Sequence, residues 1–545
     1  MDSIPDETQI THKFTHLIGQ NYEIALDQSL QTLLDYALLD TNFEKISLFT
    51  ADFNKLLQCK ANPPLETIWV YSALAFHGRI SSKDESLNHQ FTAIKELFQL
   101  IVSCSVSCDS LKSIILISPV VYHLHRISVD LKGYELRSKK EKKLMKEIKG
   151  FVDSILGYLK VCCEGLEGDF DSLEGLIRPL EDLVSVWVWD VKEKSGEGKV
   201  RLRRFFPLLG DGLVERISVV GCGLSELAGY VIGEVFLLKL CLAFRGEVSG
   251  KELQNELRTW IVGSITGLRN SYFFDSLLRM LLEPSLPVTS LLTSEDRITL
   301  RIVLYETIIL VEYSFLNPER LARLSASHVK GIALARLMVT HEAVEFFRKH
   351  GDQTKALSCM NAFSSSSLTS QVIRWVRSEI DVKDNNYGPN GSSPKAFLRW
   401  LLNIENQGIQ VFDNDMSSYR AKLVLDISEE DSKLSASKEN KKSVADLLFY
   451  IDNKGEPEDE IEKDEQMTEA ASAAFVAAAH SLQSAERGGT KRKAGNIRKK
   501  NRLKFLKYNL YEESAPPAEK PTVVDNNDLS SGSDVENPSA DEEDN

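Results

Sequence analysis

The chain has 545 residues, of which 43% are hydrophobic, 26% charged and 8% aromatic. This composition is ordinary for globular proteins, so it excludes collagen-like, disulfide-scaffold and wholly disordered chains. The formal net charge is −14 at pH 7, and more than half of the acidic excess lies after residue 451. The eight cysteines have no framework spacing, and residues 1–11 lack the basic and apolar regions of a signal peptide. We therefore expect a cytosolic or nuclear protein with reduced thiols.

The most apolar run predicts a buried helix rather than a membrane segment. This run, Leu224–Phe244, contains Glu226, Glu234 and Lys239. A membrane-spanning helix of about 20 residues rarely tolerates three charged groups. We therefore expect no membrane partner.

Apolar residues in the first 380 residues recur with the period of a helix. Predicted helices include Leu26–Leu38, Leu180–Val191 with Pro179 in its first turn, Ile298–Leu316 behind a capping signal at Thr293, and Ile332–Phe346. Breaks recur at short intervals, for example at Asn62-Pro63-Pro64 and Gly351-Asp352. Helices joined by short turns over this length favour stacked pairs over a single bundle. Because no motif repeats at a fixed period, the sequence predicts an all-α, irregular armadillo- or HEAT-like body.

The remainder of the chain divides by composition. Residues 381–394 read as a linker, and 395–451 as a mostly helical extension in which 408–412 and 420–427 alternate like a small hairpin. Residues 452–490 combine an acidic linker with an Ala-rich helix over 465–485, residues 491–507 are strongly basic, and 508–545 predict an acidic disordered tail. The predicted Ala-rich helix has one narrow apolar stripe, formed by Met467, Ala471, Ala474, Phe475, Ala478 and Leu482.

Three patterns resemble catalytic or metal sites, and each departs from its motif. Ile217–Gly223 looks like a strand entering a dinucleotide-binding turn, but Glu226 stands where the third glycine is needed, which favours close helix packing. Cys104, Cys108, His123 and His125 have the ligand types of a zinc site, without the tight spacing of a zinc knuckle. His341-Glu342 lacks the second histidine of a zinc protease. We therefore predict no enzyme, cofactor or metal site, with core cysteines and interface histidines instead.

The strongest local signal is the basic segment 491–507, which has nine positive residues and no acidic one. Its two clusters, 491–493 and 498–500, resemble a nuclear import signal recognised by importin, and the cations beyond them alternate with groups that stack on bases. A solvated charge run is the alternative. The residues assigned to import and RNA contact are Lys491, Arg492, Lys493, Arg498, Lys499, Lys500, Arg502, Lys504 and Lys507.

Two further features bear on partners. A second basic patch includes Lys139, Lys142, Lys143, Lys146 and Lys149, which share one face of a predicted helix, either as a solvated helix start or as an RNA-facing ridge. In the tail, Ser531, Ser533 and Ser539 each precede an acidic residue by three positions, a pattern that predicts phosphorylation by acidophilic kinases.

A long helical body, a basic segment and acidic flanks make a layout similar to that of nucleolar assembly factors. The similarity implies entry into the nucleus, contact with ribosomal RNA and binding of several proteins. We therefore expect a non-enzymatic scaffold of the nucleus and nucleolus that acts in ribosome biogenesis and pre-rRNA processing. Its expected partners are importin, other nuclear and pre-ribosomal proteins, and RNA, with no small-molecule substrate. The alternative is a nuclear adaptor in transcription or chromatin that contacts histones.

Overall fold

The structure, a computed structural model, describes residues 21–39, 46–80, 86–133, 139–164, 176–188, 198–219, 222–245, 250–321, 324–366, 368–380, 389 and 391–412. Within these ranges every regular element is a helix, and no strand occurs. The prediction of an all-α protein is therefore confirmed for the described body. All of these residues belong to one compact unit, residues 1–442, which is distinct from a second unit, residues 443–545.

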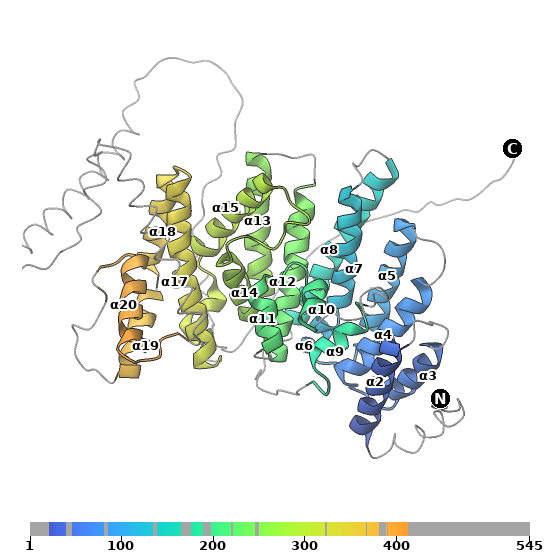
Figure 1. Cartoon of the computed structure of the whole chain (residues 1–545). Coiled ribbons are helices and arrows are strands. Elements are labelled where there is room, and N and C mark those ends of the chain that lie inside the picture. Colours follow the sequence, from blue (N-terminus) through green and yellow to red (C-terminus); the bar gives the residue numbers. More distant parts are fainter. Residues whose placement is uncertain are drawn as a thin grey trace, which may run out of the picture. The chain divides into compact units, whose positions relative to one another are not determined.

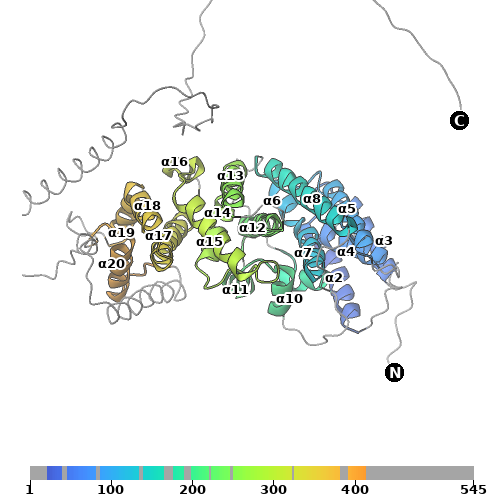
Figure 2. The same cartoon turned by 90° about the horizontal axis from the view of Figure 1, so that it is seen from above.

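The helices follow one another in chain order, from α2 in blue to α20 in orange (Figures 1 and 2). The first half comprises α2 (Tyr22–Leu39), α3 (Ile46–Gln58), α4 (Leu65–Ile80), α5 (Leu87–Cys104), α6 (Ser110–Ile115), α7 (Ser118–Gly133), α8 (Lys139–Glu164), α9 (Leu180–Ser185), α10 (Gly198–Phe205) and α11 (Asp211–Val219). The second half comprises α12 (Leu224–Ala243), α13 (Lys251–Leu268), α14 (Ser271–Leu281), α15 (Ser294–Ile309), the 3-10 turn η2 (Ser314–Leu316), α16 (Pro318–Leu321), α17 (Ala326–Lys349), α18 (Gln353–Ser365), α19 (Leu368–Ile380) and α20 (Pro394–Asn406).

Local sequence signals fix many of the helix boundaries. Thr293 begins α15 with a capping box, in which its hydroxyl accepts from the backbone of Asp296 while the Asp296 carboxylate accepts from the backbone of Thr293. Gly351 adopts a φ of 76° directly after α17, a left-handed conformation that favours glycine, and Asp352 then caps α18. The predicted breaks at residues 62–64 and 351–352 are therefore confirmed.

Two predicted helices end earlier than their apolar patterns indicate. The predicted helix 180–191 stops at Ser185, where Trp187 turns into the core and its backbone N–H donates to the carbonyl of Val184. The predicted helix 298–316 stops at Ile309. There the Tyr313 hydroxyl donates to the backbone carbonyl of Thr307 over 3.0 Å, which satisfies one of the carbonyls left free at the helix end.

The helices of the middle and C-terminal part contact one another in two parallel series. One series runs α7, α12, α14 and α17, and the other runs α8, α13, α15 and α18. Contacts between α7 and α8, α8 and α12, α15 and α17, and α17 and α18 join the two series. This two-layered stacking is the arrangement by which successive helix pairs build one continuous core.

Helix α12 is a deeply buried member of the first series and also contacts α8 of the second. Of its 20 residues, 16 are buried, and it contacts α6, α7, α8 and α14. At Gly229 a side chain has no room, because an added Cβ atom would lie 2.6 Å from the carbonyl carbon of Tyr272 in α14. The close helix packing expected for residues 217–223 is not tested there, because 220 and 221 lie outside the described residues. Ile217 lies in α11, and Gly223 caps α12.

Buried carboxylates connect helices that are distant in sequence. Glu306 of α15 pairs with Arg258 of α13 and, over 3.0 Å, with Lys355 of α18. These ion pairs therefore run along the α13–α15–α18 series. Glu66 of α4 similarly accepts the backbone N–H of Ile177, which precedes α9, over 2.5 Å.

The C-terminal helices complete the described body. The predicted linker 381–394 falls between α19 and the first residue of α20, and α20 packs against α17. The Phe397 ring of α20 also lies 5.4 Å from the ring of Phe363 in α18. Residues 408–412 follow α20 as non-helical chain with Val411 and Phe412 buried. The second arm of the predicted hairpin, 420–427, lies outside the described residues, as do the predicted helices after it.

One stretch of the described chain, Ser110–Lys132, is long and apolar enough to cross a membrane by composition alone. Its apolar window is 83% buried inside the protein, as in the core helix of a soluble protein. Ser110–Lys132 spans α6 and α7, so the packing of these helices accounts for its hydropathy.

Glu234 gives the fold a testable pH dependence. Its carboxyl oxygen accepts the backbone N–H groups of Leu208 and Leu209 over 2.7 and 2.8 Å, and complete burial raises the pKa of Glu234 to about 8. The unfolded chain releases this proton near pH 4.5, so native stability falls as pH rises from about 4.5 to 8.

Glu234→Gln keeps an oxygen acceptor and removes the titration. We expect the urea midpoint of this variant to equal the wild-type value near pH 4.5 and to exceed it by a growing margin up to pH 8. The exposed Glu256→Gln serves as the matched control and should leave the pH profile unchanged. A wild-type advantage that persists at pH 8 would contradict this assignment.

Candidate nucleic-acid interface

The residues predicted for import, RNA contact and phosphorylation all lie after residue 490, outside the described residues. Within the described body, the second basic patch is the feature that remains as a candidate interface. It begins helix α8, as the sequence predicts.

Six lysines follow the N-terminal half of α8: Lys139, Lys140, Lys142, Lys143, Lys146 and Lys149. The first five are exposed and Lys149 is half-buried, while Leu144, Met145 and Ile148 on the opposite face enter the core. Amphipathic spacing therefore anchors the helix through its apolar face and leaves the ammonium groups in solvent.

Acidic residues neutralise this surface only in part. Glu147 pairs with Lys95 over 3.5 Å and with Lys143 over 3.9 Å. No acidic residue of the described chain forms an ion pair with Lys142 or Lys146. These two ammonium groups are therefore free to bind a phosphate, which a lysine contacts as a point charge.

Positive charges from outside α8 lie near Lys149, the last lysine of the row. Burial lowers the pKa of Lys149, and the charges of Lys239 in α12 and Arg245 after α12 lower it further. Lys239 is itself paired with Asp153 over 2.7 Å. An anion at Lys149 would relieve this repulsion, so the electrostatics of the site favour a negatively charged ligand.

An open groove of about 310 Å³ continues the lysine row along the same stripe of α8. The row Lys142, Lys146 and Lys149 proceeds in steps of three and four residues to groove residues that include Asp153, Leu156 and Lys160. The opposite wall comes from α13. It consists of Trp260, Gly263, Ser264, Gly267 and Leu268.

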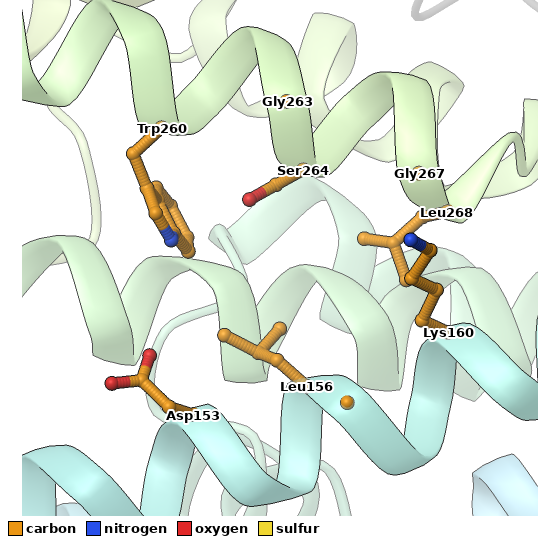
Figure 3. Close-up of a pocket in the computed structure, with 9 residues that line it drawn as sticks. Asp153, Leu156, Lys160, Trp260, Gly263, Ser264, Gly267 and Leu268 are labelled. Carbon is orange, nitrogen blue, oxygen red and sulfur yellow. The ribbon is translucent and has the colours of Figure 1, made fainter. Parts of the chain in front are cut away.

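The two walls of the groove are formed by facing residues of α8 and α13, spaced three or four positions apart along each helix. Trp260 and Leu156 point toward each other at one end, and Lys160 lies beside Leu268 at the other (Figure 3). A Cβ atom added at Gly157 or Gly263 would meet no other atom within 4 Å. The glycines therefore leave the space between the helices open to an apolar ligand.

Sequence reasoning missed this groove. The sequence feature that could have indicated it is a set of small residues, Gly263, Ser264 and Gly267, on the same helix face as Trp260. Only the packing of α13 against α8 shows that this face meets Gly157 and Leu156.

The cysteines and histidines considered for zinc make other contacts in the structure. The described residues contain no group of three or more His, Cys, Asp or Glu side chains placed to hold a metal ion. His125 contacts the Ser290 hydroxyl over 3.2 Å, and burial raises the pKa of the Cys108 thiol to about 11. These residues therefore have the environments of ordinary core and interface side chains.

His123 belongs to a buried aromatic cluster instead. Its ring lies 4.3 Å from Phe76 and 5.9 Å from Trp187, and His77 of α4 lies 6.0 Å from the same tryptophan. His77 contacts the backbone carbonyl of Val186 over 2.9 Å. Burial lowers the pKa of His77 to about 4 and holds that of His123 well below 6.5, so both rings are neutral at pH 7.

Comparison with protein-family models, with curated proteins and with solved structures gives no match to this chain. The features that bear on function are therefore the lysine row, the groove and the charged segments.

The buried histidines predict sensitivity to acid. In the unfolded chain a histidine binds its proton near pH 6.5, whereas His77 binds one only near pH 4, so stability decreases as pH falls through that window. The Nε2 atom of His123 is buried without a hydrogen-bond partner among the described residues. His123→Phe removes this polar atom. It also removes a histidine whose protonation at low pH favours the unfolded chain.

We expect the urea midpoint of His123→Phe to equal or exceed the wild-type value at pH 7, and the gap to widen in its favour at pH 5. The exposed His350→Phe is the control. A variant that is less stable than the wild type at pH 5 would show that the His123 ring makes a polar contact the cluster needs.

Proposed function

We propose that this chain is a non-enzymatic scaffold of the nucleus and nucleolus that acts in ribosome biogenesis and pre-rRNA processing. The single observation that carries the proposal is the exposed lysine row of α8, which presents free ammonium groups on a long body of stacked helices. Phosphate contacts of this kind position a protein on RNA without reading its sequence.

The fold suits a protein that holds several partners. Two series of helices expose many side chains at their turns and outer faces, which is how armadillo- and HEAT-type arrays bind other proteins. We assign the body to that irregular repeat class. The tail 508–545, rich in acidic residues and poor in apolar ones, is assigned as disordered.

The basic segment 491–507 supplies nuclear entry and a second RNA contact. Importin would read the clusters 491–493 and 498–500, while the cations that follow would meet phosphates beside stacking side chains. Phosphate groups on Ser531, Ser533 and Ser539 would each add about −1.5 to −2 charge to the tail and strengthen its competition for these cations.

A nuclear adaptor that contacts histones is the second candidate, supported by the acidic segments 452–464 and 525–544. The two functions differ in what the purified chain binds. Higher affinity for ribosomal RNA than for histones, together with co-sedimentation with pre-ribosomal particles, supports the scaffold. Preference for histones and absence from those particles would favour the adaptor.

The lysine row can be tested directly in the full chain. In Lys142→Gln/Lys146→Gln, two phosphate contacts are lost, so we expect RNA affinity to fall several-fold near 100 mM salt and the slope of log affinity against log salt to decrease by about 1.4 for single-stranded RNA. The control is Lys55→Gln/Lys60→Gln, with the same charge change on and beside α3. Equal losses in both variants would mean that only net charge matters, and would remove α8 as an interface.

The import assignment predicts a change in location. Replacing Lys491, Arg492, Lys493, Arg498, Lys499 and Lys500 with alanine removes the six charges that importin would read. We expect a fluorescent fusion of this variant to lose nuclear accumulation while its circular dichroism stays helical. The control exchanges lysine and arginine at the same six positions, which keeps each charge and should preserve import. Nuclear accumulation of the alanine variant would refute the assignment.

A further inference from the structure

Trp260 gives the groove between α8 and α13 a flat aromatic surface. Its indole ring stacks on Phe236 of α12, with ring centroids 5.1 Å apart and an interplanar angle of 25°. Phe236 is fully buried, whereas Trp260 is half-buried and lines the groove. Phe236 therefore supports the ring from the core, and the remaining surface of the ring is left to a ligand that enters the groove.

The space beside this ring is open enough for a planar ligand. The groove has a volume of about 310 Å³, at the lower end of the range of small-ligand sites, which is roughly 300–1,000 Å³. Gly157 of α8 and Gly263 of α13 leave it open, because an added Cβ atom at either position would meet nothing within 4 Å. The hydroxyl of Ser264 also lines the groove and can exchange hydrogen bonds with the polar edge of a ring.

Positive charges lie at both ends of the groove. Lys149 precedes Asp153 by one turn of α8, and Lys160 lies beside Leu268 at the other end (Figure 3). The stem of Lys160 extends toward α13, since a Cβ atom added to Gly267 would lie 3.3 Å from its Cε atom. The eleven residues from Lys149 to Lys160 span about 16 Å along the helix. The two lysines therefore flank the aromatic wall.

Among the described residues that line the groove, Asp153 is the one carboxylate. Both of its oxygens lie 2.7 Å from the ammonium nitrogen of Lys239 in α12. Three cations stand against this carboxylate: Lys149, Lys160 and Lys239. The surroundings of the groove therefore stay positively charged and favour a ligand that carries negative groups on both sides of its ring.

This combination of groups favours an unpaired nucleobase. Proteins bind single-stranded nucleic acid by stacking bases on aromatic side chains while lysines and arginines contact the backbone. In a duplex the faces of each base are covered by its neighbours, so only an unpaired base could stack on Trp260. The exposed Lys142 and Lys146 lead along α8 toward this ring, so a strand bound to the lysine row would arrive at the groove.

We infer that the groove binds one base of single-stranded RNA, stacked on Trp260, with the flanking phosphates at Lys149 and Lys160. The strand then continues past Lys146 and Lys142 toward the N-terminal end of α8. This inference rests on the proposed RNA contact of the lysine row, and it adds a site that responds to bases rather than to phosphates alone.

Substitutions at Trp260 separate stacking from apolar filling. Trp260→Leu keeps an apolar side chain and removes the aromatic face, so the affinity of the full chain for a short oligoadenylate strand should fall by roughly 5- to 150-fold at fixed salt. Trp260→Phe keeps an aromatic face and should lose much less. The control, Trp400→Leu, changes a half-buried tryptophan of α20 outside the groove and should leave the affinity unchanged. Equal affinities of Trp260→Leu and the wild type would overturn the stacking.

A strand without bases distinguishes this site from the lysine row. An abasic ribose-phosphate strand of the same length keeps the phosphate contacts, so the wild type should bind it more weakly than oligoadenylate, whereas Trp260→Leu should bind the two strands nearly alike. The slope of log affinity against log salt should be the same for Trp260→Leu and the wild type, because no phosphate contact is lost.

The outcomes for the wild type separate this inference from the proposed function. Equal binding of the two strands would overturn the base site and leave the lysine row as an RNA contact. Binding of neither strand would refute the RNA contact itself and this inference with it. Adenosine monophosphate should bind more weakly than the strand, because one phosphate cannot reach both flanking lysines. Equal affinity would make a free nucleotide the ligand and overturn the RNA assignment.

Filling the groove tests where the base lies. In Gly263→Leu the new side chain has open space in the body and occupies the groove, so the protein should fold normally and its affinity for oligoadenylate should fall by about tenfold. Gly78→Leu adds the same side chain at an exposed glycine of α4 with open space and should match the wild type.

A strand with one 4-thiouracil base reports the position directly. On irradiation it should crosslink to peptides that contain 153–160 or 260–268 in the wild type, and the yield should fall in Gly263→Leu. Full affinity of Gly263→Leu, or crosslinks confined to other parts of the chain, would overturn the site and leave the groove to a protein partner.

Discussion

The close approach of α12 and α14 at Gly229 is the contact on which the rest of the body depends. The backbone of Tyr272 lies where a side chain at this position would begin, so α12 can reach α14 only because the residue is glycine. Helix α12 is then surrounded by α6, α7, α8 and α14 and contributes apolar residues on every side. Within its own series α12 joins α7 to α14, and through α8 it also contacts the second series.

Backbone polar groups next to a fully buried helix have no access to water and need hydrogen-bond partners inside the protein. Buried carboxyl groups supply some of these partners. Glu234 accepts two backbone N–H groups from the turn between α10 and α11, and the N–H of Leu208 would otherwise lie unsatisfied in the core. Glu306 joins three helices of the outer series through Arg258 and Lys355. Both acids specify which elements pack together, and Glu234 does so at the cost of a pH-dependent stability.

The lysine row and the groove are two parts of one helix face. Helix α8 enters the core through residues such as Ile148 and Val152, and this fixes the direction of its opposite side. Along α8, this side is basic from Lys142 to Lys149 and includes the apolar Leu156 further on. An extended ligand lying along it would therefore contact charged surface at one end and apolar surface at the other.

The amino-acid sequence by itself determined the helical class, the caps and the basic face of α8. These are local properties, since the capping box at Thr293, the turn at Gly351 and the spacing of Lys142, Lys146 and Lys149 depend on residues within a few positions of one another. The early end of the helix at Ser185 was not predictable in this way, because it follows from the burial of Trp187 against Trp69 and Phe76, more than a hundred residues earlier.

Only the tertiary structure decided which helices lie side by side, and therefore where a groove forms. In the sequence Gly157 and Gly263 are two isolated glycines, and four cysteines and histidines have the ligand types of a zinc site without its spacing. Packing placed the glycines on facing walls and turned His123 toward an aromatic cluster while His125 reached Ser290. Contacts between residues far apart in the chain depend on the summed packing of the core, which no local pattern encodes.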